Sequence, residues 1–503
     1  MIWVEIMLST VIKSWNYNLS PNNYAAISPI IIIGLFALFV LIAELIRPNT
    51  KISYGLSIVG ILSSVLDSIL LLVVHTSSIF FSNSLKINSS SLALNILFLI
   101  SALIVVLISG PFNKDSNRAE YLFLILCAVF QMMFLGTVQN LLALYICMEA
   151  LAIPGYLLVG WNRDLKAGES SIKFYILGVL ASALILYGIS LIFGLVGSTN
   201  FGTITQFVLH IDKVPPALMV ALIAILGGLG FKISAMPFHF WAPDAYEGAP
   251  VAIAAFLSVA SKAAGFVVLV ILVVELFSPL FYLWQGFLAI VATLTMLGGA
   301  LAALRQTNVL RFVAYSSIAQ SGFILTPLVI SASKGGLSKN AIAVSFLYLG
   351  IYVISNLGVF VVISLVRDHK ISTEINSYRG LYSRSPLLAF CLSIFLFSLA
   401  GIPPLGGWFA KFDLFSVVFK SGSFLALFLG FVALVSSVIS LVYYAKIVRI
   451  LWEEKQGLII KISLTKTNLA LGTALVVCAG GVVISGLYPQ LFINWANLIH
   501  FVA

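Results

Sequence analysis

The sequence predicts an all-α integral membrane protein with about fourteen transmembrane helices, and composition and hydropathy support that prediction. Hydrophobic residues make up 61% of the 503 residues and charged residues only 9%, whereas a soluble domain has roughly a quarter charged residues. The apolar residues form continuous runs close to the roughly 20 residues that a helix needs to cross a bilayer. A transmembrane barrel would instead show short segments in which apolar and polar residues alternate.

Fourteen apolar runs define the expected helices in order along the chain. They cover residues 24–46, 53–75, 91–110, 118–137, 139–161, 170–196, 216–238, 251–275, 281–303, 309–331, 340–366, 386–420, 423–445 and 468–490. The first twenty residues lack the basic start and the small-residue cleavage site of a signal peptide, so we expect a retained amphipathic lead-in there.

The basic residues predict how these helices are oriented. Of the 27 lysines and arginines, eighteen lie in loops that follow odd-numbered spans, six lie on the opposite side and three lie inside spans. Because loops on the inner side of a membrane carry the excess of Lys and Arg, both termini are expected outside. The net charge of +10 therefore reflects topology, and we expect no nucleic-acid partner.

Two of the spans contain helix-breaking residues. The seventh runs into PFHFWAPDAYEGAP, and the twelfth is interrupted by GIPPLGG at 401–407. Proline removes a backbone donor and breaks a helix, which inside a membrane is tolerated where the chain lines a cavity. The broken spans lie five apart, so units built around them would insert in opposite orientations, as in secondary transporters. The prolines concerned are Pro237, Pro243, Pro250, Pro403 and Pro404.

Four ionisable side chains fall deep within predicted spans: Glu149 in the fifth, Lys232 in the seventh, Lys262 in the eighth and Lys411 in the twelfth. Each costs at least about 2.5–3.5 kcal/mol to insert, so we expect them to be paired or hydrated. All three cations are lysines, which can lose a proton, and we expect no buried arginine, which effectively cannot. The pattern predicts proton transfer.

One structural alternative is that Glu149 and Lys232 form a single buried ion pair that locks two helices together. That alternative explains Lys262 and Lys411 poorly, because no acid lies deep in their own spans. Asp413 is two residues from Lys411 and so faces another side of the helix.

Three further polar residues are candidates for the same pathway. His239 follows a helix break and could bridge the lysines of the seventh and eighth spans through water, although a packed linker histidine is an equal alternative. Tyr315 and Ser316 belong to a polar patch in the tenth span. For these two, hydrogen bonding between helices is slightly favoured over a relay role.

The remaining polar and reactive residues have simpler interpretations. Glu44 and Asp67 are expected to face other subunits or the membrane edge, and Tyr443 and Tyr444 to be interfacial aromatics. The four cysteines sit alone within apolar spans and are expected to be hydrophobic fillers. They are Cys127, Cys147, Cys391 and Cys478.

Motifs for cofactors and metals are missing from the sequence. It contains no GxGxxG after a strand, no Walker loop and no HExxH, and its five histidines are scattered. We therefore expect no metal and no bound redox cofactor in this chain. Nothing predicts ATP binding either.

Four stretches resemble one known family. They are GFKISAMPFHFWAPDAYEGAPVAIAAFLSVASK (230–262), QTNVLRFVAYSSIAQSG (306–322), YRGL (378–381) and AGIPPLGGWFAKF (400–412). Together they resemble the antiporter-like membrane subunits of respiratory complex I, over nearly the whole chain and least over the first 90 residues. In that family a glutamate of the fifth span and lysines of the seventh, eighth and twelfth form the central proton axis. The resemblance implies this role for Glu149, Lys232, Lys262 and Lys411.

The resemblance also implies the architecture, namely two inverted five-helix repeats with broken seventh and twelfth helices. The expected sections are 1–117 for the lead-in and helices 1–3, 118–275 for the first repeat (helices 4–8), 276–450 for the second repeat (helices 9–13) and 451–503 for a loop and helix 14.

The same resemblance implies the partners and the setting. NADH, FMN, iron–sulfur clusters and quinone would be bound by partner subunits. This chain would then be an obligate hetero-oligomer with other membrane-arm subunits, both antiporter-like and small, in a lipid bilayer. A bacterial plasma membrane is expected, with an organelle inner membrane as the alternative.

The expected function is proton translocation as a non-redox, membrane-arm subunit of a complex-I-type NADH:quinone oxidoreductase. Moving one charge against 100 mV costs about 2.3 kcal/mol, so quinone reduction elsewhere would be the driver. The first alternative is a subunit of a multi-subunit cation/proton antiporter, which shares the lysines but against which YEGAP and YRGL weigh. The others are a self-contained carrier, for which the sequence shows no polar substrate cavity, and a purely structural subunit.

Overall fold

The computed structural model describes residues 24–47, 50–81, 83–110, 118–333, 336–368, 372–454 and 469–499. Twelve helices in this part of the chain are long and apolar enough to cross a membrane. Two shorter apolar helices, α9 (Pro216–Lys232) and α17 (Pro386–Ala400), are the first halves of the two interrupted segments. The all-α membrane class and the fourteen predicted segments are therefore confirmed. The predicted lead-in lies outside the described residues.

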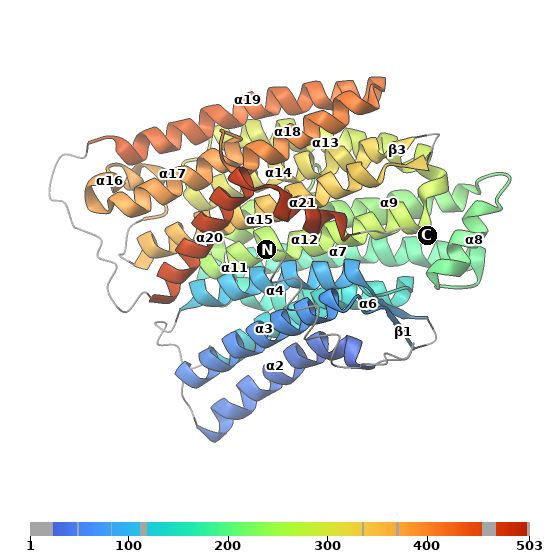
Figure 1. Ribbon diagram of the computed structural model, residues 1–503, viewed down its shortest axis with the longest axis horizontal. Coiled ribbons are helices and arrows are strands. Elements are labelled where there is room, and N and C mark those ends of the chain that lie inside the picture. Colours follow the sequence, from blue (N-terminus) through green and yellow to red (C-terminus); the bar gives the residue numbers. More distant parts are fainter. Residues whose placement is uncertain are drawn as a thin grey trace.

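The N-terminal section contributes three long helices and one hairpin. In order its elements are η1 (Tyr24–Ile27), α2 (Ser28–Ile46), α3 (Thr50–Val73), β1 (Ser78–Phe80), β2 (Leu85–Ile87) and α4 (Ser89–Ser109). Asn88 and Ser91 form a capping box at the start of α4, each side chain accepting from the other's backbone N–H, which satisfies donors that the first turn leaves free. In Figure 1, α2 and α3 form the lower edge of the molecule.

The first expected repeat contains three long helices, a broken helix and a final long segment. Its elements are α5 (Arg118–Leu135), α6 (Leu141–Val159), α7 (Leu165–Val196), α8 (Phe201–Leu209), α9, α10 (Trp241–Gly248), α11 (Val251–Phe256), η2 (Leu257–Ser261), α12 (Lys262–Val270) and η3 (Ile271–Leu276). α9 ends at Lys232, short of the predicted boundary at 238, and the chain is not helical again until α10. Pro237 lies in this break, where it cannot donate a helical hydrogen bond.

The second expected repeat has the same order of long helices, broken helix and long helix. The elements of this repeat and of the chain after it are η4 (Ser278–Leu280), α13 (Phe281–Leu304), α14 (Val309–Ser331), β3 (Ala332–Ser333), β4 (Gly336–Leu337), α15 (Lys339–Asp368), η5 (Ile375–Tyr378), α16 (Leu381–Arg384), α17, α18 (Gly406–Ser421), α19 (Phe424–Trp452), α20 (Leu469–Leu487) and α21 (Gln490–Asn497). Gly401 takes a left-handed conformation with φ 91° directly after α17, which is a common way for a helix to end.

Three spans form the buried centre of the molecule. In the most apolar stretches of Val251–Leu276, Val309–Ser331 and Lys339–Arg367, 94% of the residues are buried, against 28% for Lys51–Val73. The outer helices instead expose large apolar side chains such as Leu180 of α7. Such surfaces suit contact with lipid tails, which are as apolar as these side chains.

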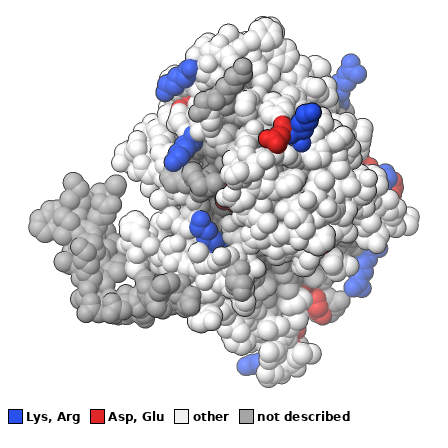
Figure 2. All heavy atoms as spheres, turned by 90° about the vertical axis from the view of Figure 1, so that its right-hand side faces the viewer, with Lys and Arg blue, Asp and Glu red and all other residues white. Residues whose placement is uncertain are grey.

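Loops that follow even-numbered spans gather at one end of the molecule. α8 and the strands β1 and β3 lie at the right-hand end in Figure 1, whereas α16 lies at the left-hand end. Figure 2 shows the right-hand end, where charged residues are scattered over a mostly uncharged surface. The predicted orientation, in which the opposite end is the inner one and carries most of the basic residues, stays a prediction.

Candidate functional site

Glu149 and Lys232 form an ion pair inside the helix bundle. Glu149 lies in the middle of α6 and Lys232 is the last residue of α9. The Lys232 Nζ atom lies 3.5 Å from Glu149 Oε1, and Ser182 of α7 donates a hydrogen bond to the same carboxylate. The pair therefore joins three helices at the point where α9 stops.

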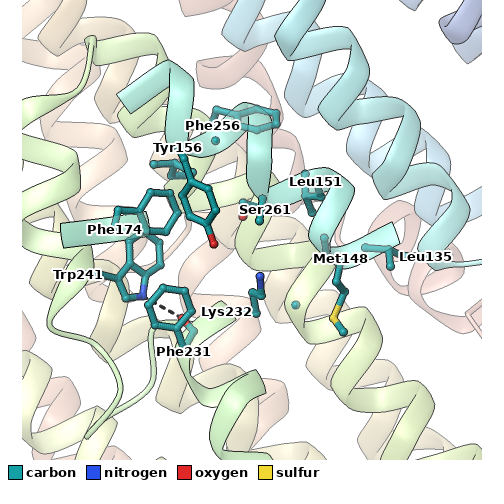
Figure 3. A pocket seen from close by; sticks show the side chains of 15 residues that line it. Leu135, Met148, Leu151, Tyr156, Phe174, Phe231, Lys232, Trp241, Phe256 and Ser261 are labelled. Carbon is teal, nitrogen blue, oxygen red and sulfur yellow. Dashed lines mark hydrogen bonds between the residues drawn. The ribbon is translucent and has the colours of Figure 1, made fainter. Parts of the chain in front are cut away.

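A cavity of about 30 Å³ adjoins Lys232. Tyr156 of α6 and Ser261 of η2 line it together with Lys232 among apolar and aromatic side chains (Figure 3). The Tyr156 hydroxyl is buried and has no hydrogen-bond partner in the described protein. Because a cavity of about 10–15 Å³ suffices for one water, this one has room for water beside the ammonium.

Lys262 is fully buried and is bound by neutral oxygens. Its Nζ donates to the backbone carbonyl and to the Oγ of Ser317 on α14, each at 3.0 Å, and its exposed fraction is 0%. Lys262 directly follows the π-helical turn Leu257–Ser261. Single π-helical turns are frequent at functional sites, so the local structure as well as the charge marks this position.

Gly265 lets the two lysine-bearing segments approach closely. It follows Lys262 by one turn on α12, and a Cβ on it would lie 3.3 Å from the backbone carbonyl carbon of Lys232 and 3.0 Å from Ile233 Cγ2. A larger side chain here would push the end of α9 away. Gly265 therefore sets the spacing between Lys232 and Lys262.

A polar cluster that sequence reasoning missed lies beside the same π-helical turn. Tyr352 Oη donates to the carbonyl of Ser258 at 2.9 Å, and Asn356 Nδ2 donates to Ser258 Oγ at 3.0 Å and to Tyr352 Oη at 3.1 Å. Ser258 precedes Lys262 by one turn. The available signal was Tyr348, Tyr352 and Asn356 spaced four apart in an apolar span, which places them on one face of a helix.

Lys411 forms a hydrogen bond across the break in the twelfth segment. Its Nζ donates to the carbonyl of Ala400, the last residue of α17, at 2.7 Å, and lies 4.9 Å from the ring centroid of Phe323. A Cβ on Gly401 would lie 2.7 Å from Lys411 Cδ, so only glycine leaves room for the lysine. The ammonium satisfies a free carbonyl at a helix C-terminus, where the helix dipole favours a cation.

Side chains of α14 and α15 connect the eighth and twelfth segments. Tyr348 Oη donates to Gln320 Oε1 at 2.7 Å, and Gln320 Nε2 donates to the carbonyl of Leu399 at 3.1 Å. A cavity of about 10 Å³ is lined by Gln320, Tyr352 and Ala410, the residue before the lysine of α18. Polar groups therefore run from the π-helical turn to the break of the twelfth segment.

The three predicted relay residues, His239, Tyr315 and Ser316, have different surroundings. His239 is buried in the break after α9, and its Nδ1 has no hydrogen-bond partner among the residues that the structure describes. Its ring lies 6.2 Å from the ring of Tyr315, and within the described residues no hydrogen bond joins it to the neighbouring lysines. Ser316 bonds the hydroxyl of Tyr444 at 2.5 Å, which is the bonding between helices that the sequence favoured. A relay role for these residues stays a prediction.

Two predictions about buried residues are wrong. Tyr443 and Tyr444 are 2% and 0% exposed rather than interfacial, because α19 packs this face against α14, where Phe312 contacts both rings edge-on. Arg118 is 4% exposed although no buried arginine was expected. Its guanidinium at the start of α5 lies 5.5 Å from the ring centroid of Tyr54, a contact that hydropathy along one span does not reveal.

Glu44 and Asp67 join the first two long helices. Ser53 Oγ donates to Glu44 Oε2 at 2.7 Å, and Ser28 Oγ donates to Asp67. Each half-buried acid is therefore satisfied by a serine of the neighbouring helix. That these acids face other subunits or the membrane edge stays a prediction.

A cluster of ion pairs connects the two expected repeats at the predicted inner end. Asp244 and Glu247 of α10 bind Arg311 of α14 at 2.7 and 2.9 Å, and Lys173 and Lys166 of α7 approach them at 3.1 and 2.6 Å. Burial alone would raise the pKa of both carboxyls, but these cations hold the pKa of each below its ordinary value. Sequence reasoning missed the cluster, although both acids stand in the PFHFWAPDAYEGAP break.

Two relatives and a family profile agree on what the sequence is similar to. The profile of the family described as NADH:quinone oxidoreductase/Mrp antiporter, TM, matches residues 138–440. NADH-quinone oxidoreductase subunit N 1 of Koribacter versatilis is 35% identical over 498 residues, which cover 95% of this chain and 96% of that protein. The chloroplastic NAD(P)H-quinone oxidoreductase subunit 2 of Mesostigma viride is 38% identical over 439 residues, 85% of each.

A solved structure shows the same fold. A chain of respiratory complex I from Thermus thermophilus matches with a TM-score of 0.75 and 26% identity, and the match covers 93% of this chain and 98% of that chain. The family profile, which matches residues 138–440, includes both broken segments and the helices between them.

Proposed function

The chain belongs to the NADH:quinone oxidoreductase/Mrp antiporter family of transmembrane subunits, and from that premise we propose that Glu149, Lys232, Lys262 and Lys411 carry protons through it. It is a proton-translocating membrane subunit of a complex-I-type NADH:quinone oxidoreductase. Quinone reduction elsewhere in the complex supplies the free energy.

The chemistry around the three lysines is the observation that supports the proposal. Lys232 pairs with a carboxylate at 3.5 Å, whereas Lys262 and Lys411 are bound by serine and backbone oxygens. The protonation of a buried group responds strongly to charges that approach or leave. A lysine without its own counter-ion therefore gains or loses a proton according to the charge on the neighbouring site.

Transfer begins in this proposal when the Glu149–Lys232 pair separates. Lys232 then loses its counter-charge and passes a proton through water in the adjoining cavity towards Lys262. From there the polar cluster on α15 and the small cavity between α14 and α18 lead to Lys411. Lysine suits each step because arginine would keep its proton.

The antiporter alternative shares the family profile, so the profile alone does not separate the two functions. The relatives do favour one of them. Both relatives, each matched over 85% or more of this chain, are subunits of NADH-quinone or NAD(P)H-quinone oxidoreductases. The complex-I-type function is therefore the better supported, and an antiporter subunit is the second candidate.

The setting of the chain is part of the same proposal. It is a non-redox subunit, with FMN, iron–sulfur clusters and quinone held by partner subunits. It is an obligate member of a multi-subunit membrane assembly beside other antiporter-like and small membrane subunits. Residues 118–275 and 276–450 act as the two inverted repeats. The relatives come from a bacterium and from a chloroplast, so a bacterial plasma membrane is proposed, with an organelle membrane as the alternative.

The proposal is tested in the assembled complex reconstituted into vesicles. Lys262→Ala is compared with Lys213→Ala, a matched control because Lys213 is exposed in a loop. NADH-driven proton pumping should fall about 100-fold in Lys262→Ala, the lower end of what loss of a proton-transfer group costs, and stay unchanged in the control. Normal pumping by a normally assembled Lys262→Ala complex would contradict the relay.

A further inference from the structure

Tyr156 places a buried hydroxyl in the cavity beside Lys232. The side chain is 7% exposed, and its Oη has no hydrogen-bond partner among the residues that the structure describes. In Figure 3 the hydroxyl end of the ring is directed into the cavity, on the side where Lys232 lies. A buried hydroxyl without a partner is costly, and buried water commonly binds such polar groups. Water in this cavity can therefore connect the Tyr156 hydroxyl with the Lys232 ammonium.

One face of α7 holds Tyr156 in this position. The face is made of residues spaced three or four apart, which places them on one side of a helix. They are Ser171, Phe174, Gly178 and Ser182. Ser171 Oγ donates to the carbonyl of Tyr156 at 2.8 Å, and the ring of Phe174 packs edge-on against the tyrosine ring at 4.8 Å between centroids. Gly178 leaves space for the hydroxyl, because a Cβ on it would overlap Oη. At the end of the same face, Ser182 donates to the carboxylate of Glu149.

The Tyr156 hydroxyl lies between the Glu149–Lys232 pair and the predicted inner end of the bundle. Tyr156 follows Glu149 by seven residues on α6, so the two lie on the same face, about 10 Å apart along the helix axis. α6 ends three residues after the tyrosine, at Val159. This is the end of the fifth span that the distribution of basic residues predicts to be inner. A proton that enters from that side therefore meets Tyr156 before it reaches the ion pair.

We propose that Tyr156 is a further proton-relay residue, which passes protons from the predicted inner side to the Glu149–Lys232 pair. This inference rests on the proposed function and adds the residue through which the pair receives its next proton. In each transfer Oη accepts a proton from a water on the inner side and gives its own proton to a water beside Lys232. One O–H bond forms as the other breaks, so the tyrosine is neutral before and after the step. No buried charge is left on the ring, where it would be costly.

The contacts of the hydroxyl argue against a purely structural role. Polar side chains that stabilise a membrane bundle bond across helices, as Tyr352 does to the carbonyl of Ser258. The Tyr156 hydroxyl makes no such bond to the described residues, and the residue of α7 that faces it is a glycine. The ring of Tyr156 contributes to packing, whereas its hydroxyl contributes a proton donor and acceptor to the cavity.

The test compares Tyr156→Phe with Tyr175→Phe in the whole complex that contains this chain, reconstituted into vesicles. Tyr156→Phe keeps the packed ring and removes only the hydroxyl. NADH-driven proton pumping should fall about tenfold, less than for loss of a full proton-transfer group, because water in the cavity can carry part of the transfer. Tyr175 is the matched control, since it is 53% exposed and packs edge-on against Tyr156. Tyr175→Phe should pump normally.

A stability measurement separates a relay from a packing role. Because Oη has no partner among the described residues, the unfolding temperature of the Tyr156→Phe chain in detergent should equal or exceed that of the wild type. Slower pumping without a loss of stability supports the relay. Pumping at the wild-type rate overturns it, and so does slower pumping that accompanies a lower unfolding temperature.

A second variant moves the hydroxyl without removing it. A Cβ on Gly178 would overlap Oη, whereas a Cβ on Gly194 of the same helix would meet no atom of the described residues within 4 Å. Gly178→Ala should therefore slow pumping and Gly194→Ala should not, and equal rates in the two overturn the proposal.

Lys262→Ala, measured in parallel, tests the proposed function by itself. If Lys262→Ala stops pumping and Tyr156→Phe leaves its rate unchanged, only the role of Tyr156 is wrong. Normal pumping in both variants overturns the proposed function as well.

Discussion

Lys262 Nζ donates two hydrogen bonds to one residue, the carbonyl and hydroxyl oxygens of Ser317, each 3.0 Å away. Both acceptors are neutral, and Lys262 is 0% exposed, so the site holds an ammonium without a carboxylate beside it. An unpaired buried charge is costly, and intramembrane ionisable groups are kept mainly where they have a function. If this lysine becomes neutral, it leaves no opposite charge stranded. The Lys262–Ser317 contact therefore suits a lysine that gains and loses a proton rather than one that is permanently paired.

Lys262→Arg should retain the positive charge and abolish proton transfer at this position. Because arginine effectively cannot be deprotonated, we expect NADH-driven proton pumping to fall about 100-fold, as in an alanine variant. Vesicle acidification measures the pumping, and the amount of assembled complex serves as the control. Lys262→Met, similar in length and uncharged, should assemble and fail to pump. Substantial pumping in either variant would mean that the residue only binds α12 to α14.

Removing either member of the Glu149–Lys232 pair alone should lower the free energy of unfolding by more than half of what removing both members does. A single substitution, Glu149→Gln or Lys232→Met, leaves the partner charge buried without a counter-ion. We expect a coupling free energy of about 1–3 kcal/mol in a double-mutant cycle, measured by denaturant unfolding of the chain in detergent micelles. Strictly additive effects of the two substitutions would show that the 3.5 Å contact contributes nothing to folding.

Gly401→Ala should impair pumping more than an equivalent change elsewhere. A Cβ at Gly401 would lie 2.7 Å from Lys411 Cδ, so the lysine must leave the carbonyl of Ala400. Gly422→Ala is the matched control. Gly422 also has a left-handed conformation, with φ 59°, but a Cβ on it would have no neighbouring atom of the described residues within 4 Å. Both substitutions carry about 1–2 kcal/mol of backbone strain, and only Gly401→Ala should lower the rate of vesicle acidification. Equal rates of vesicle acidification in the two variants would show that proton transport does not depend on the position of Lys411.

The ion pairs around Arg311 should make the stability of the fold depend on pH in the acidic range. Burial alone would raise the pKa of Asp244 and Glu247, but bonds to Arg311 and neighbouring lysines hold both values below the ordinary range. Such carboxyls contribute stability that is complete above their ordinary pKa, about 4, and is lost as pH falls through the lower folded value. The unfolding temperature of the solubilised chain should therefore drop below about pH 4.

Arg311→Gln should weaken that dependence, because the folded carboxyls would titrate closer to their ordinary pKa. Thermal unfolding followed by tryptophan fluorescence at a series of pH values measures the slope. Arg449→Gln is the control, since Arg449 pairs with Glu453 away from the cluster. An identical acid slope in wild type and Arg311→Gln would mean that the ion pairs seen here do not stabilise the fold.

Hydropathy predicts the depth of a residue in the membrane, which is why much of the site could be found from sequence. Glu149 and Lys262 stand near the middle of their apolar runs, and the breaks after Lys232 and at Gly401 are marked by proline and glycine. Depth also indicated that Tyr315 and Ser316 belong to a polar patch. These inferences need only the order of residues along one helix.

Hydropathy does not predict which side of a helix faces which neighbour, and the errors are of that kind. Tyr444 stands near the end of the predicted span 423–445, yet it is fully buried because α19 continues to Trp452 and packs against α14. Tyr352 and Asn356 meet the π-helical turn only because α15 lies beside it. Arg311 reaches the acids of α10 across the boundary between the two expected repeats. Each contact depends on the packing of segments that are distant in sequence.

The burial of the central spans bears on the membranes in which such a chain can work. The most apolar stretches of Val309–Ser331 and Lys339–Arg367 have 94% of their residues buried, whereas Lys51–Val73 and Phe424–Trp452 have 28% and 39%. A thicker or thinner bilayer acts on helices in contact with lipid, which adjust by tilting at a fraction of a kcal/mol per Å. These two helices, and Val251–Leu276 with its Lys262, contact protein on nearly all sides, so they can keep Lys262 bound to Ser317 while the outer helices tilt. The Lys262 site should therefore change little when bilayer thickness changes.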